Sequence, residues 1–138
     1  MTTKMKTKKS KPTRADANKV WWWCVNEYGR SKINGSYPHL EFRKFNYYDD
    51  ESAYGFYDEI ENVICVNRST NKTLIDLIDT IIHEWTHYHQ PIKSHVRRMA
   101  KEGRIDELFE DNDPLEKEAQ KVARRDSERC YQELYLLS

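Results

Sequence analysis

The sequence has few cysteines and no long apolar stretch, and both absences exclude classes of protein. Its three cysteines, Cys24, Cys65 and Cys130, are odd in number, far apart and never in a CxxC pair. They support neither a disulfide framework nor a four-cysteine zinc site, so we expect each to pack as a small buried apolar residue. No apolar run approaches the ~18 residues of a membrane span, and no signal-peptide core follows the N-terminus. We therefore expect a cytoplasmic protein, from a bacterium or a phage, with no membrane partner.

Acidic residues are absent from the start of the chain, although the whole sequence has a net charge of zero. The first 14 residues hold six of the 23 Lys and Arg residues, which leaves 17 basic against 23 acidic residues in the rest of the chain. Such a block is typical of a solvated, disordered arm, and a nucleic-acid contact is its functional interpretation. We predict a disordered basic tail over residues 1–14 and one folded domain over residues 15–138.

The order of helical and strand-like patterns predicts an α+β domain. Apolar periodicity and turn residues divide the chain into a helix over residues 15–28, strands over 37–48, 53–58 and 62–67, and helices over 73–89, 93–103 and from 113 onward. The three short strands predict a small, mostly antiparallel sheet. Gly29 should end the first helix, and Asp113 followed by Pro114 should begin the last. The run Trp21–Trp23 covers most of the first helix's circumference, so at least one ring should face solvent or a partner.

The segment from Thr80 to Tyr88 carries the residues on which a functional prediction depends. If it is helical, His83 and His87 lie one turn apart on one face and can both bind a single Zn²⁺. Glu84 points about 100° away around the helix, which places it beside a metal-held water as a general base rather than as a ligand. The alternative is a core helix with two incidental histidines, but the strongly apolar run before His83 favours the metal interpretation.

Two histidines do not complete a catalytic zinc site, so a third ligand must come from elsewhere in the chain. The pattern HExxHxxGxxH is excluded, because Gln90 and Lys93 occupy the positions of its glycine and last histidine. His89 lies roughly 160° around the helix from the face that the pair forms, so it is a poor ligand. The remaining sources are a carboxylate on the last helix or, less directly, His95.

Helical-wheel geometry separates two glutamates at the start of the last helix. Its apolar stripe runs through Ala119 and Ala123, which leaves Glu116 at the edge of the stripe and Glu118 farther out. We predict Glu116 as the third zinc ligand, with Glu118 as the alternative. A capping box with Asp113 is the competing role for Glu116.

These motifs, in this order, resemble the ImmA/IrrE-type metallopeptidases, small gluzincins whose third ligand is the first Glu of a Glu-x-x-Ala-x-x-Phe-Ala helix. The resemblance rests on Ile64–Asn67, on the HExxH motif and on Glu116-x-x-Ala119-x-x-Val122-Ala123, where Val122 stands in place of Phe. It implies a compact zincin-like domain with one zinc ion per chain. SprT-like proteins, which use a third His, show a weaker resemblance.

The resulting expectation is a zinc-dependent metallopeptidase that acts on a protein or peptide substrate. Glu84 would take a proton from the zinc-activated water and deliver it to the leaving amine. The strand at 62–67 would be the sheet edge that pairs with an extended substrate, and Tyr88, His39 or His95 would stabilise the oxyanion. The alternative is a non-catalytic zincin-like module that binds nucleic acid or a host protein through the basic tail and the Trp cluster.

Overall fold

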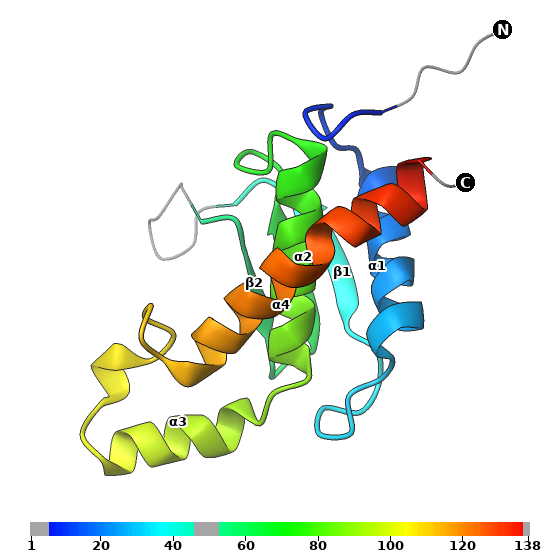
Figure 1. Ribbon diagram of the computed structural model, residues 1–138. Coiled ribbons are helices and arrows are strands. Elements are labelled where there is room, and N and C mark those ends of the chain that lie inside the picture. Colours follow the sequence, from blue (N-terminus) through cyan, green and yellow to red (C-terminus); the bar gives the residue numbers. More distant parts are fainter. Residues whose placement is uncertain (1–5, 46–52, 137–138) are drawn as a thin grey trace, which may run out of the picture.

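The structure, a computed structural model, describes residues 6–45 and 53–136 and has four α-helices and a three-stranded sheet in those residues (Figure 1). The elements, in chain order, are α1 (Arg14–Tyr28), β1 (His39–Arg43), β2 (Gly55–Asp58), β3 (Val63–Asn67), α2 (Leu74–Tyr88), α3 (Ile92–Lys101), a 3-10 turn (Ile105–Glu107), α4 (Pro114–Tyr131) and a π-helical segment (Gln132–Leu136). The predicted α+β class is therefore confirmed. Residues 46–48 of the first predicted strand lie outside the described residues.

The sheet is mixed, which corrects the prediction of a mostly antiparallel sheet. Its order is β1-β3-β2, with β1 parallel and β2 antiparallel to β3. The strand predicted to be the substrate-pairing edge is thus the central strand, with a neighbour on each side. Ile64, Cys65 and Val66 are buried in succession, as is typical of a strand that is covered on both faces.

Helix α2 is the centre of the hydrophobic core, because its apolar residues cover most of its circumference. Ile78, Ile81, Ile82 and Trp85 are fully buried. Figure 1 shows α4 crossing in front of α2, with the sheet on the far side of α2 and α1 beside it. This packing brings the start of α4 to the C-terminal half of α2, where the histidines lie.

The N-terminal segment lies against the domain from residue 6 onward, which differs from the expected disordered tail. The Lys6 ammonium pairs with the buried carboxylate of Asp16, and the Lys8 ammonium pairs with Glu128 on α4. The Tyr131 hydroxyl donates to the backbone carbonyl of Lys6 over 3.1 Å. Two of the basic residues that suggested a solvated arm are thus bound to acidic residues of the folded domain; residues 1–5 lie outside the described residues.

The same segment completes the N-terminus of α2. The first amides of an α-helix have no partner inside the helix and need one elsewhere. Here the amides of Leu74 and Ile75 donate to the carbonyls of Ser10 and Lys8, over 2.8 and 3.0 Å, and the hydroxyl of Thr73 accepts from the third amide. The helix that carries the histidines therefore begins on contacts from a distant part of the chain.

The aromatic helix α1 matches its prediction at both ends and on its surface. Gly29 ends it with a φ of 73°, a conformation that glycine adopts without strain. Trp22 is 60% exposed, whereas Trp23 is buried. The three cysteines are buried and free, as expected. In the described part of the chain, no helix combines the length and the apolar character that crossing a membrane requires.

Candidate metal centre

His83 and His87 lie one turn apart on the side of α2 that lines an open cavity. The segment is helical because Thr73 caps its N-terminus and its apolar residues recur at helical spacing up to Tyr88. The two imidazole rings are 5.0 Å apart between centroids, at an interplanar angle of 72°. Both rings are mostly buried, so the helix presents two nitrogen donors at one place in a partly dry environment.

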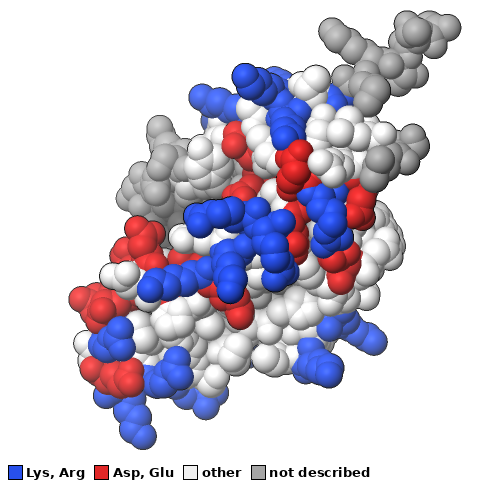
Figure 2. All heavy atoms as spheres, in the orientation of Figure 1, with Lys and Arg blue, Asp and Glu red and all other residues white. Residues whose placement is uncertain are grey.

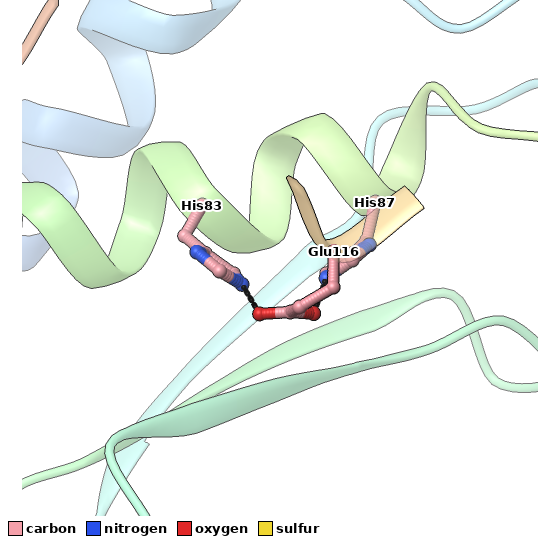
Figure 3. A group of neighbouring side chains, drawn as sticks. All are labelled: His83, His87 and Glu116. Carbon is pink, nitrogen blue, oxygen red and sulfur yellow. Dashed lines mark hydrogen bonds and ion pairs between the residues drawn. The ribbon is translucent and has the colours of Figure 1, made fainter. Parts of the chain in front are cut away.

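Glu116 reaches both histidines from the first turn of α4. One carboxylate oxygen, Oε1, lies 2.7 Å from His83 Nε2, and the other, Oε2, lies 3.1 Å from His87 Nε2 (Figure 3). The three donor atoms all lie within 4.8 Å of one another. The structure thus brings together the three residues that were predicted as ligands, and the group could hold a metal ion. No other group of three or more His, Cys, Asp or Glu residues in the described part of the chain does so.

Asp113 fixes the start of α4 and leaves Glu116 free to turn toward the histidines. Its carboxylate accepts hydrogen bonds from the amides of Leu115, over 3.0 Å, and Phe109, over 2.6 Å, and it pairs with the buried His95 at 2.9 Å. Glu116 does not form the capping box considered from the sequence, because the histidines engage both of its oxygens. His95 is occupied by Asp113, which removes it as a candidate ligand.

Glu118 is not at the centre, but it contributes to a second layer of contacts behind His87. The buried side chain of Gln90 accepts a hydrogen bond from His87 Nδ1 over 2.6 Å and donates to Glu118 Oε1 over 2.8 Å. Sequence reasoning used Gln90 only to exclude a longer histidine motif and missed this role. The available signal was its spacing, because a residue three positions after His87 can reach the same side of a helix.

The three candidate ligands shift one another's pKa values. Burial acts to raise the pKa of Glu116, but the hydrogen bonds from His83 and His87 outweigh it and lower that pKa to about 2. Burial acts to lower the pKa of His87, yet the hydrogen bond to Glu116 and the charge of Glu84 raise it to about 8. The pKa of His83 is raised by the same two carboxylates against the effect of burial. Without a metal, the group is therefore held together by a carboxylate between two imidazoles that favour their protonated forms.

Glu84 is buried beside this group and is not one of its three donors. Burial raises the pKa of its carboxyl group above the ordinary value, and the nearby histidines oppose that shift in part. The backbone of Tyr57, on β2, hydrogen-bonds to the carboxylate and holds it at the cavity wall. A carboxylate with a raised pKa next to a candidate metal site is suited to exchange a proton near neutral pH.

An open cavity of about 510 Å³ exposes the three candidate ligands and Glu84. Its walls come from β2, from α2 and from Phe109, whose ring centroid lies 5.2 Å from that of His87. Strand β2 approaches α2 closely at Gly55, where an added Cβ would lie 2.8 Å from Thr80 Cγ2 and 2.7 Å from the carbonyl oxygen of Cys65. Only glycine fits there without displacing backbone, so this residue sets the distance between the sheet and the helix that carries the histidines.

None of the three residues proposed to stabilise an oxyanion lines this cavity. The hydroxyl of Tyr88 is engaged by the loop after α1, where it accepts from the amide of Ser31 and donates to the carbonyl of Gly35. His95 is paired with Asp113, and His39 lies on the edge strand β1. The structure therefore brings none of the three residues to the cavity that the histidine pair lines.

Comparison of the chain with protein-family models, with curated proteins and with solved structures gives no match, so the case for a function rests on the chemistry of the site.

Proposed function

We propose that this protein is a zinc-dependent metallopeptidase whose metal ligands are His83, His87 and Glu116. The observation that carries the proposal is the convergence of Glu116, from a separate helix, on two histidines that stand beside a buried Glu84 in an open cavity. A purely structural ion pair would not need the cavity or the second carboxylate. The arrangement also supports the zincin-like character that the sequence motif suggests.

The donor set fits zinc. Two imidazole nitrogens and one carboxylate are the ligands of a common type of catalytic zinc site, which keeps a fourth position open. Tetrahedral ligands at ordinary zinc distances lie about 3.3 Å apart, whereas the three donor atoms lie within 4.8 Å of one another. The His83–Glu116 contact would therefore have to widen by roughly half an ångström, and the most distant pair of donor atoms would have to approach.

In this proposal zinc, when bound, lowers the pKa of a water molecule and polarises the scissile carbonyl. Glu84 then acts as general base and general acid. Its carboxylate takes the proton of the attacking water, and the same proton passes to the leaving amine as the peptide bond breaks. The buried position of Glu84 supports this role, because burial favours the protonated form that the second step needs.

We place the substrate along β2 rather than along the strand at 62–67. β2 is an edge strand of the sheet and its residues Gly55–Tyr57 line the cavity beside the histidines. An extended peptide that aligns with an edge strand presents its backbone carbonyls at regular intervals. Such a peptide would bring one carbonyl to the metal group and the next residues toward Phe109.

The test is the substitution Glu84→Gln in zinc-loaded protein, assayed on a proteome-derived peptide library by mass spectrometry. The variant should keep about one zinc per chain and lose at least ~100-fold in cleavage rate, since general-base catalysis contributes on the order of 10²–10⁴. The exposed Glu110→Gln is the matched control and should cleave like the wild type. Full activity of Glu84→Gln would contradict the base assignment, and a zinc-loaded wild type that cleaves no peptide would contradict the proposal.

A non-catalytic module that binds nucleic acid is the second candidate, and the charge on α4 favours it. Figure 2 shows Lys and Arg side chains gathered over α4, where Lys117, Lys121, Arg124 and Arg125 are exposed. Such a surface attracts phosphates. This candidate predicts that wild type and Glu84→Gln behave alike in the same peptide assay.

A further inference from the structure

Gln90 contacts both helices that supply the candidate metal ligands. It follows the C-terminus of α2, and the residue is 3% exposed. The side-chain oxygen lies 2.6 Å from His87 Nδ1, whereas the side-chain nitrogen donates to the carbonyl of Leu115 over 2.9 Å and to Glu118 Oε1 over 2.8 Å. All of the usual hydrogen-bonding groups of the amide are thus engaged.

The contact with His87 decides which ring nitrogen carries the proton. The nitrogen of Gln90 is committed to two acceptors on α4, so the amide cannot turn over without breaking both bonds. Its oxygen must therefore face the ring, and an oxygen can only accept. His87 Nδ1 consequently keeps its proton, and Nε2, which donates to Glu116 in the metal-free protein, is the nitrogen that gives up its proton and offers a lone pair to a metal.

The contact with α4 fixes the third ligand. Leu115, whose carbonyl accepts from Gln90, is the neighbour of Glu116 in the first turn of α4, and Glu118 lies two residues beyond it. The two bonds therefore tie the start of α4 to the end of the histidine helix, beside the contacts that Glu116 itself makes with His83 and His87.

We propose that Gln90 is a positioning residue of the metal centre, which orients His87 and anchors the helix turn that carries Glu116. Glu118, considered from the sequence as a ligand, acts through Gln90 as the acceptor that keeps the amide in one orientation. The inference rests on the metal-binding part of the proposed function and does not depend on peptide cleavage.

The test measures zinc affinity by competition with a chromogenic chelator, at a temperature where every apo variant is folded. Gln90→Leu should lower the affinity 10- to 100-fold, as is usual when the partner of a metal-bound histidine is removed. Glu118→Gln should have little effect, because a glutamine oxygen can still accept from Gln90. The exchanged pair, Gln90→Glu with Glu118→Gln, should restore only part of the affinity, because a carboxylate at 90 accepts from both His87 and the new amide but cannot donate to the carbonyl of Leu115.

A matched control separates positioning from a general effect on the end of α2. Asn34 donates to the backbone carbonyls of Tyr88 and Gln90, over 2.6 and 3.3 Å, but its side chain contacts none of the candidate ligands. The substitution Asn34→Leu should therefore destabilise the apo protein and leave its zinc affinity unchanged. In the zinc-loaded wild type, the Nδ1 proton of His87 should give a slowly exchanging NMR signal that is lost in Gln90→Leu. Equal zinc affinity of Gln90→Leu and the wild type overturns the inference alone. A wild type that binds no zinc overturns it together with the metal centre.

Discussion

Raising the pH should destabilise the metal-free protein, because its candidate ligands hold one another through charge. The perturbation is a change from pH 6 to pH 9 in the presence of a chelator. The pKa of His87 is about 8 in the folded protein, against an ordinary value of 6.5. A folded-state pKa above the unfolded value means that the group's contribution is complete below pH 6.5 and is lost as the pH rises through 8.

The size of the loss follows from the shift of His87. A difference of about 1.5 pKa units corresponds to about 2 kcal/mol of folding free energy. For a chain of this length that is a decrease of about 7 °C in the melting temperature. Glu116 is shifted farther, to about 2, because it faces two histidines, but its contribution describes the same contacts and is not added. Because the pKa of Glu116 is lowered in the folded protein, its contribution to folding stability is complete above pH 4.5 and is lost only as the pH falls toward 2.

Thermal unfolding followed by circular dichroism at several pH values measures the effect. The control is Glu116→Gln, which keeps the size of the side chain and removes one of the two charges that raise the pKa values of His83 and His87. The wild type should lose more than this variant between pH 6 and pH 9, by up to about 2 kcal/mol, because Glu84 still raises the pKa of His87 in the variant. If the two proteins show the same pH dependence, the ion-pair account of the metal-free centre is wrong. With zinc bound the trend should reverse, since metal replaces the protons on the histidines.

Two further predictions concern the ligand set and the sheet. Glu116→Ala should lower the zinc content of the purified protein well below one ion per chain, whereas Glu118→Ala should retain far more zinc. Metal analysis of both variants checks this, and a normal zinc content in Glu116→Ala would exclude Glu116 as the third ligand. Gly55→Ala should lower the free energy of unfolding by about 1–3 kcal/mol in urea titrations, because the new Cβ meets the carbonyl of Cys65 and Thr80. Adding Thr80→Ser should recover only part of that loss, since the carbonyl contact remains, and full recovery would show that Cys65 imposes no limit.

The two helices of the centre could be predicted because their signals are local. The spacing of His83 and His87 requires only one turn of regular helix to place both rings on one face. The choice of Glu116 over Glu118 came from the apolar stripe of α4, since the face that packs on α2 determines which glutamate turns inward. Asp113 then marked where that helix begins, which fixed the register of the wheel.

The sheet order and the N-terminal segment could not be predicted, because they depend on contacts between distant residues. Three short strands can be arranged in several ways, and a sequence pattern does not state which strand lies between the other two. The unbroken apolar run Val63–Val66 was a signal for a central strand. The run of lysines offered no sign that Lys6 would meet a buried Asp16, since charge patterning alone describes a solvated arm equally well.

Gln90 shows how one residue can be interpreted correctly for one question and missed for another. Its identity excluded a glycine at that position of a longer zinc motif, which is a statement about pattern. Its hydrogen bonds depend on where α4 starts in space, and the sequence gives no direct measure of that. Buried amides at the end of a metal-binding helix are therefore worth testing whenever a ligand is missing from the motif itself.

The docking of the first residues on α2 has a consequence for how the protein can be cut or fused. Ser10 and Lys8 supply acceptors to the first two amides of the helix that carries His83, at its far end. Proteolytic nicking between residues 10 and 14 would leave these acceptors held to the domain only by non-covalent contacts such as Lys8–Glu128, and the first turn of α2 would fray more readily. The order of the helix that carries the histidines thus depends on a stretch of chain more than sixty residues away in sequence, and a partner that binds the lysine-rich segment would destabilise the start of that helix.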